Sequence, residues 1–517
     1  MSGALGGLGE LDMELLRGNR FCMGVKRGRE YQCGGDADEN AINKAVELLA
    51  EAVRRILRWR VWETWWIEEA IDEWLIARDR LEQRLRGRYS EEVVNDLLRL
   101  VNKFINYNEQ FLNYWHEVGN ETKELIEDLT NGRAEVVIRG EDVSGISIHG
   151  EYVTLKVDKM GTNAPVKLVL KGFRSMTMRV PDVFKKTMNR EEYGRFVNDV
   201  LRALEGGFEE TDGFDENGKA AMGTTQVWQV IVWSILYPGR NYVYINIINV
   251  NENDVTILWR LRSNHDSLKG VMLENVDKLS TEGLLAFTLT AVLGDGWADI
   301  VKVAVNGRVY DEAVIGIGMS SEEFEGWVPL LERLKGMGFR SAKPKTKEGN
   351  GVEVPFYSSN AINLARAMIS VLPPILRDVL DALSFEKWVN LRRIAEMEVK
   401  FKIGESQIII ANYGFTVNVL KSTVILERKA KDDTEVKMVV DALRAVYGDG
   451  FIVNVYKSSG YLLITIPMYV FEKYDDIKGQ VIEVLRKKLE RTKDEEKRQT
   501  ILKHLMRLAP KGDSCSD

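Results

Sequence analysis

The stretch of residues 280–296, STEGLLAFTLTAVLGDG, decides the fold that we expect for the middle of this chain. A hydroxyl at Ser280 and an acid at Glu282 make a good helix start, because the hydroxyl caps free N–H groups and the acid favours the positive end of the helix dipole. Ten residues without a charge follow, from Leu284 to Leu293. A helix that is apolar on every side must be buried on every side. The sequence therefore predicts a short buried helix that ends at Gly294-Asp295-Gly296.

One face of this helix carries small residues. Ala286, Thr290 and Gly294 lie at positions i, i+4 and i+8, where they allow another backbone to approach closely. An acid at the end of such an interface, here Asp295, is how two related subunits can share a metal site for phosphodiester chemistry. The residues alone also allow a second interpretation, a core helix that is ended by a glycine, with Asp295 merely in the turn.

Residues 291–296, AVLGDG, resemble the LLGDG variant of the LAGLIDADG motif of homing endonucleases. The elements expected downstream follow the order of that fold, strand, strand, helix, strand, strand, helix, over residues 276–396. The resemblance implies Mg²⁺ binding by Asp295 and a saddle-shaped sheet on DNA. The cations that it places against the DNA backbone are Lys302, Arg308, Lys343, Lys345 and Lys347. The wider chain resembles the PaREP-type repeat proteins of hyperthermophilic archaea, a multicopy family without an assigned activity.

An internal comparison finds a second, degenerate copy of this module in residues 397–517. A shift of 112 residues sets Gly336-Met337-Gly338-Phe339 onto Gly448-Asp449-Gly450-Phe451 without a gap. The second Gly-Asp-Gly therefore matches the turn after the middle helix and not the motif helix. Gln407 stands at the position equivalent to Asp295, and the preceding segment alternates like a strand. Because cleavage of the family type needs two acids, either Asp295 meets its equivalent across a homodimer or the protein does not cleave DNA.

The sequence of residues 1–275 predicts an architecture but no function. We expect a mobile N-terminal segment (1–36), a tryptophan-rich helical domain (37–131) and an α+β domain (132–275), which makes the chain an α+β protein of several domains. The tryptophans at 59, 62, 65, 66 and 74 are typical of a packed helical core, although the nearby arginines also allow a base-stacking platform. Gly213 to Lys219 match the start of a P-loop, but Ala220 replaces its hydroxyl, so we expect a turn that caps the next helix and no nucleotide cofactor.

Composition limits the function classes. The net charge of −7, with 13 Lys+Arg against 14 Asp+Glu in residues 281–395, requires that any nucleic-acid surface be a local basic patch. No apolar run is long enough for a membrane helix. Four scattered histidines disfavour a zinc site. Cys22, Cys33 and Cys515 predict no disulfide framework, which fits a reducing cytoplasm.

We therefore expect a DNA-binding protein of LAGLIDADG-like fold, with Mg²⁺-dependent cleavage by Asp295 from each protomer of a homodimer. The alternative is a non-catalytic nucleic-acid-binding or protein-interaction scaffold that inherited the fold.

Overall fold

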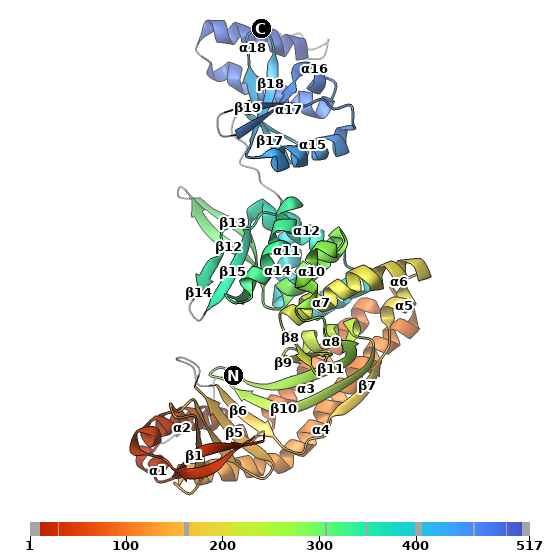
Figure 1. The fold of residues 1–517 in the computed structure, drawn as a ribbon. Coiled ribbons are helices and arrows are strands. Elements are labelled where there is room, and N and C mark those ends of the chain that lie inside the picture. The colour runs from red at the N-terminus through yellow and green to blue at the C-terminus, as the bar shows by residue number, and fades with distance from the viewer. Residues whose placement is uncertain are drawn as a thin grey trace. The chain divides into compact units, whose positions relative to one another are not determined.

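The computed structural model describes residues 11–28, 30–159, 165–305, 308–347, 350–398, 406–458, 461–492 and 494–508 (Figure 1). The fold is of the α+β class, as expected. The chain divides into two compact units, of which the first comprises Met1–Arg333 and Ser341–Met397 and the second Leu334–Arg340 and Glu398–Asp517. Among the described helices, none is both long and apolar enough to cross a membrane.

The first unit begins with four helices and a pair of strands, and the strands belong to one large sheet. The helices are α1 (Met13–Arg17), α2 (Glu39–Trp59), α3 (Trp65–Leu85) and the forty-residue α4 (Glu91–Thr130). Strands β1 (Arg20–Arg27) and β2 (Glu30–Asp36) pair with each other, and β1 runs parallel to β3 (Glu135–Arg139). The prediction of a separate mobile segment over 1–36 is therefore wrong for its described residues. Residues 1–10 lie outside the described part.

This sheet has eleven strands in the order β2-β1-β3-β4-β5-β6-β10-β11-β9-β8, with β7 on β10. Its central strands are β4 (Gly145–His149), β5 (Val153–Asp158), β6 (Val166–Leu170) and β7 (Met176–Val180). Helices α2, α3 and α4 pack on strands of this sheet, and Trp74 of α3 stacks on Phe104 of α4 and edge-on against Trp259. Trp66 and Trp74 are buried, as the packed-core interpretation predicts. Residues 37–131 and 132–275 therefore share one core and are not two domains.

The last part of this sheet belongs to an αββαββ module. A continuous helical stretch consists of α6 (Arg190–Phe196), the π-helical residues Val197–Leu201 and α7 (Arg202–Glu210), and the short α5 (Val183–Thr187) precedes it. Then come β8 (Gly213–Glu216), β9 (Lys219–Thr224), α8 (Val227–Leu236), β10 (Gly239–Val250) and β11 (Val255–Asp266). The P-loop-like segment is thus the β8–β9 hairpin, with its turn at Asn217-Gly218, and not a helix cap. We call residues 190–266 module 1.

The expected motif helix and its module follow after α9 (Val271–Glu274). The motif helix is α10 (Thr281–Leu293), capped by the side chain of Ser280 as predicted. Module 2 continues with β12 (Trp297–Val305), β13 (Arg308–Ser320), α11 (Phe324–Gly336), β14 (Lys345–Lys347), β15 (Gly351–Tyr357) and α12 (Ser358–Ser370). Its sheet order is β12-β13-β15-β14 and that of module 1 is β8-β9-β11-β10. Both modules therefore arrange their strands as first, second, fourth, third.

Two further helices complete the first unit, α13 (Pro374–Leu383) and α14 (Glu386–Glu396). Asp378 of α13 accepts hydrogen bonds from Arg84 Nε (2.8 Å), Arg88 (3.0 Å) and the Tyr89 hydroxyl (2.8 Å). These bonds fix α13 to the end of α3. Helix α14 packs on β12 and α12.

The second unit has its own apolar core and a five-stranded sheet in the order β16-β17-β18-β20-β19. Its strands are β16 (Gln407–Ile410), β17 (Tyr413–Val419), β18 (Val424–Ala430), β19 (Asn454–Ser458) and β20 (Tyr461–Pro467). Its helices are α15 (Asp433–Tyr447), α16 (Met468–Phe471), α17 (Asp475–Arg491) and α18 (Glu495–Leu508). Gly448-Asp449-Gly450 follows α15, the helix between the two hairpins, as the internal comparison predicts. Residues 399–405, where a strand pattern was expected, lie outside the described residues.

Candidate functional site

Helix α10 packs along α7 of the same chain. The two backbones approach closely at glycines: a Cβ atom on Gly207 would collide with the Thr290 hydroxyl and the Phe287 carbonyl, and one on Gly294 would collide with Thr211. Small residues at the contact are what such an approach requires. The two helices therefore form a tight pair whose C-terminal ends come together.

The small-residue stripe is thus an internal packing surface. Ala286 is fully buried and Thr290 is 3% exposed, and Gly294 lies against Thr211 and Asp212. Since α7 already covers this face, a second protomer cannot pack on it. The prediction of a homodimer through Ala286, Thr290 and Gly294 is wrong for this reason, although the expectation of close backbone packing at the stripe holds.

Each helix of the pair ends in an aspartate. Asp212 follows α7 directly before the first strand of module 1, and Asp295 follows α10 directly before the first strand of module 2. A Cβ atom on Gly294 would lie 2.9 Å from Asp212 Oδ2, which shows how near the Asp212 carboxylate lies to the end of α10. The structure therefore brings a second aspartate of the same chain, Asp212, close to the helix end that Asp295 follows.

The surroundings disfavour two negative charges at this point. Burial and, second, the negative charge of Asp295 raise the pKa of Asp212, and Lys387 and the Gln229 amide oppose them; together these effects bring the pKa to about 6. The Gln229 amide donates to Asp212 Oδ2 at 2.7 Å. Partial burial raises the pKa of the Asp295 carboxyl too, although Asp295 is exposed on one side. The pair is therefore a destabilised double anion that a cation would relieve.

Two lysines partly supply that positive charge. Lys387 of α14 donates from Nζ to the carbonyl of Leu293 (3.1 Å) and to that of Gly294. Lys269 donates from Nζ to the carbonyl of Glu210 (2.8 Å), at the end of α7. Both ammonium groups thus cap a motif helix at its negative end. Each helix end has an aspartate and a lysine.

The donor set fits a hard divalent cation. Mg²⁺ is usually bound through one or two carboxylates together with substrate phosphate oxygens, and it retains several waters. Asp212 and Asp295 supply two carboxylates, and Asp212 Oδ2 lies beside Gly294, the residue directly before Asp295. The two lysines limit the negative charge of the site, so any cation binding here depends on oxygens contributed by a ligand.

Module 1 was missed because its motif helix does not show the expected apolar pattern. Helix α7 contains three glutamates, Glu205, Glu209 and Glu210, which are 6%, 0% and 8% exposed. Each has a specific partner: Glu205 bonds His265 (3.1 Å), Glu209 accepts from Tyr237 (2.7 Å), and Glu210 accepts from the N–H of Gly270 (2.6 Å). The available signal was the Asp-Gly that precedes a strand at 212–213 and again at 295–296, a spacing of 295 − 212 = 83 residues.

The open face of the module 1 sheet is basic and aromatic. Arg179 of β7 lies opposite Arg240 of β10, and Tyr242 lies opposite Arg262 of β11. The guanidinium groups of Arg240 and Arg262 lie 5.1 Å and 4.8 Å from the Tyr242 ring centroid. Within the described part of the chain, Arg179, Arg240 and Arg262 have no carboxylate partner, whereas Arg260 pairs with Glu216 at 3.3 Å. We call Arg179, Arg240, Tyr242, Tyr244, Arg260 and Arg262 the arginine face.

The cations predicted on module 2 do not form a comparable surface. Lys302 is exposed but shares the face of β12 with Ala298, which pairs with buried Ile315, so it lies on the helix-covered side. Lys345 bonds the Tyr357 hydroxyl (2.8 Å), and Lys347 forms an ion pair with Glu353.

The two remaining predicted cations add little to module 2. Lys343 is exposed before β14, and Arg308 begins β13 but its side chain lies outside the described residues. Asp299, Glu312 and Glu353 share the open face of the module 2 sheet with Lys345 and Lys347, so this face carries charges of both signs. The nucleic-acid contacts expected of these five cations stay a prediction.

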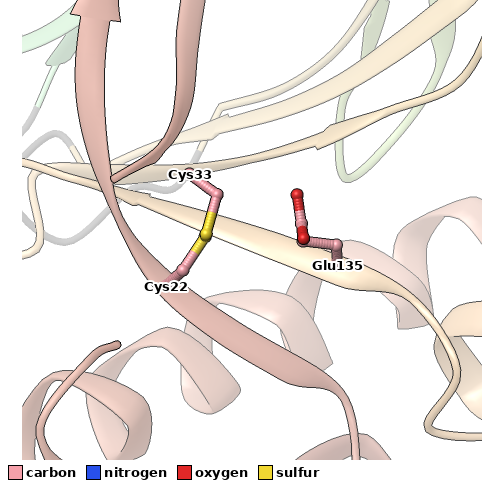
Figure 2. Close-up of side chains that lie close together, drawn as sticks. All are labelled: Cys22, Cys33 and Glu135. Atoms are coloured by element: carbon pink, nitrogen blue, oxygen red, sulfur yellow. A yellow bond between two sulfur atoms is a disulfide. The ribbon is translucent and has the colours of Figure 1, made fainter. Parts of the chain in front are cut away.

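A separate cluster, at the other end of the large sheet, joins Cys22, Cys33 and Glu135 (Figure 2). Cys22 and Cys33 form a disulfide between β1 and β2, with Cα atoms 5.5 Å apart, which differs from the expectation of no disulfide. Glu135 pairs with Arg20 at 3.2 Å. Sulfur atoms bonded to each other are not thiolate ligands, so this cluster staples the hairpin and does not present a metal site in this state.

No protein-family model and no curated protein matches the chain, so the resemblance to the archaeal repeat family has no further support. Solved structures similar to the chain include the I-SmaMI LAGLIDADG homing endonuclease bound to cleaved DNA, with 11% identity, 44% of this chain and 95% of that chain covered, and a TM-score of 0.13. The I-LtrWI LAGLIDADG homing endonuclease bound to target DNA has 12% identity, 44% and 97% coverage and a TM-score of 0.13. Similarity this low does not by itself establish a shared function.

Proposed function

We propose that the chain binds DNA through the arginine face and holds a divalent cation between Asp212 and Asp295. The observation that carries this proposal is the helix pair: two helices from two modules of one strand order, packed through small residues, each ending in an aspartate. A monomer therefore already has both acids that phosphodiester cleavage of this type needs. The resemblance of residues 291–296 to the LAGLIDADG motif supports the same function.

The residues have distinct roles under this proposal. Asp212 and Asp295 would hold Mg²⁺, which would supply Lewis-acid stabilisation of the charge that develops in phosphodiester cleavage. Gln229 fixes the Asp212 carboxylate through its hydrogen bond of 2.7 Å. Lys387 and Lys269 limit the repulsion between the acids while no cation is bound. The arginine face neutralises backbone phosphates, and this attraction supplies most of the affinity of such proteins for DNA.

The second candidate function is DNA binding without cleavage. The observation that favours it is the charge asymmetry of the two modules, because Asp299, Glu312 and Glu353 offset Lys345 and Lys347 on the open face of module 2, whereas cations exceed acids on the arginine face. A saddle with one basic half and one half of balanced charge would hold a duplex mainly on module 1. Under this second function the phosphodiester does not reach the two acids, so binding persists and cleavage does not occur.

The test uses supercoiled plasmid with Mg²⁺ and three proteins: the unaltered chain, Asp212→Asn and Asp295→Asn. We expect nicking by the unaltered chain alone, with DNA retention by all three. Nicking that survives in both variants would remove the two aspartates from the mechanism. Retention without nicking by any protein would favour the non-catalytic function.

A second experiment tests the arginine face. Arg240→Ala/Arg262→Ala should weaken DNA retention and reduce the salt dependence, by about one unit of log–log slope for each phosphate contact removed. The matched control is Arg54→Ala/Arg133→Ala, two exposed arginines that pair with Glu51 and Asp128 on other surfaces. Equal effects of the two double variants would show that net charge alone, and not the arginine face, governs binding.

A further inference from the structure

A polar cavity of about 560 Å³ lies where α4, the β7–α5 connection and the start of β10 meet. Helix α4 lines it with Asp96, Arg99 and Lys103, and the opposite wall includes Arg179 and Asp182. Lys186 of α5 adds a further cation. Four cations thus line the cavity beside two acids, and because Lys186 also pairs with Glu92 at 2.6 Å outside the lining, the excess of positive charge rests on Lys103 and Arg179.

The two acids of the cavity already have partners. Asp96 accepts a hydrogen bond from Lys186 at 2.6 Å and lies 3.5 Å from Arg99. Asp182 accepts from the backbone N–H of Lys185 at 3.0 Å, as the cap of α5, and from the Tyr193 hydroxyl. Neither acid is left to neutralise Lys103 or Arg179, which form no ion pair within the described part of the chain.

The strand register adds to this excess. Arg179 of β7 lies directly opposite Arg240 of β10, and like charges in directly opposed positions destabilise a strand pair. An anion between the two guanidinium groups would convert this repulsion into a pair of charge-assisted hydrogen bonds. Arg179 also belongs to both surfaces, because it lines the cavity and is part of the arginine face.

We propose that this cavity binds phosphate groups, and that they belong to the backbone of a nucleic acid that continues beyond the arginine face. This inference rests on the proposed DNA binding. The cavity reaches the size of small-ligand sites, which begin at roughly 300 Å³, so it can admit a phosphate with its sugar. None of its lining residues is aromatic, so the described walls contain no ring on which a base could stack. That composition favours a backbone segment over a free nucleotide.

The test compares Lys103→Glu with Lys185→Glu. Both change the charge of the chain equally, but Lys185 is exposed on α5 and does not line the cavity. Fluorescence anisotropy with labelled duplex DNA is measured over a range of salt concentrations. We expect Lys103→Glu to weaken binding and to lower the slope of log affinity against log salt by about 1, with Lys185→Glu close to the unaltered chain. Equal slopes for all three proteins would overturn the cavity proposal, while the DNA-binding function would stand if Arg240→Ala/Arg262→Ala still weakens retention.

A second arm separates the phosphate source. Inorganic pyrophosphate is titrated by calorimetry into the unaltered chain and into Lys103→Glu, in the absence of DNA. The unaltered chain could bind pyrophosphate, lose that binding in Lys103→Glu, and yet fail to retain DNA. This result would keep the anion site but overturn nucleic acid as its ligand. The absence of both pyrophosphate binding and a Lys103-dependent DNA affinity would overturn the site as a whole.

Discussion

Glu210 lies two residues before Asp212, and its carboxylate accepts the backbone N–H of Gly270 at 2.6 Å. Burial raises the pKa of Glu210 to about 7, against an ordinary value of 4.5, although the Gly270 hydrogen bond and Lys269 act in the opposite direction. The folded chain thus holds a proton between these two pH values that the unfolded chain has released. Stability from this group is present below pH 4.5 and is lost as the pH rises through about 7,.

Glu210→Gln should remove this pH dependence, because its amide oxygen can still accept the Gly270 N–H and has no charge to bury. We expect the variant to match the unaltered chain at about pH 4 and to be more stable at about pH 8, by on the order of 3–4 kcal/mol, since the pKa rises from 4.5 to about 7 and each pKa unit corresponds to about 1.4 kcal/mol. Thermal unfolding across this range measures the difference. Two parallel stability curves would show that Glu210 ionises as readily in the folded chain as in the unfolded one.

At the scale of elements, the α7–α10 pair depends on how closely two backbones approach. A methyl group on Gly207 meets the Phe287 carbonyl, a backbone atom that cannot rotate away. Gly207→Ala should therefore destabilise the chain by about 1–3 kcal/mol, the usual cost of overpacking a filled core. Gly194→Ala is the matched control, because it lies earlier in the same helical stretch and a Cβ atom there meets nothing within 4 Å.

The control should stabilise the chain slightly, by about 0.5–1 kcal/mol, since alanine has less conformational freedom to lose than glycine in a helix. Denaturant unfolding of both variants measures these changes. If Gly207→Ala is as benign as Gly194→Ala, the helices are not in the tight contact described above.

A second pair of elements, α13 and α14, carries Lys387 to the end of α10. Asp378 fixes α13 through three hydrogen bonds, from Arg84, Arg88 and Tyr89. Asp378→Asn removes the negative charge that these bonds need, and hydrogen bonds to charged groups contribute about 1.5–3 kcal/mol each. Faster amide hydrogen exchange should appear across residues 374–396, whereas Asp79→Asn, at an exposed pair with Arg78, should change nothing. Unaltered exchange in Asp378→Asn would mean that apolar packing alone holds α13.

The elements also show what could and could not be predicted from the sequence. Helix α10 was predictable because its apolar run, its Ser280 cap and its Gly294 end are all local signals. Helix α7 was not, because Glu205, Glu209 and Glu210 look like a solvated face and become core only through His265, Tyr237 and Gly270, which lie far along the chain. Of the two aspartates in the proposed site, the sequence therefore pointed to Asp295 alone, and Asp212 emerged only from the packing of α7 on α10.

At the scale of the whole molecule, the pairing of strands far apart in the chain decided the domain organisation, which the sequence left open. Strand β1 pairs in parallel with β3, with Arg20 opposite Glu135, across three intervening helices. No local pattern predicts such a pairing, which is why residues 1–275 were divided into three parts where the structure has one sheet. The net charge of −7 was likewise a poor guide, because four arginines gather on one surface, the arginine face, although the chain as a whole is acidic.

The packing of α7 on α10 within one chain also determines how many chains are needed to bring the two aspartates together. Because α7 covers α10 and supplies Asp212, the chain needs no second copy to complete the acid pair. We expect light scattering to give a mass near 58.9 kDa, with no assembly through the motif helix. Gly294→Leu then distinguishes the two arrangements: its side chain would collide with Thr211 and Asp212, so it should lower the melting temperature of a monomer. A chain of twice this mass that Gly294→Leu converts into well-folded monomers would instead place α10 at a surface between two copies.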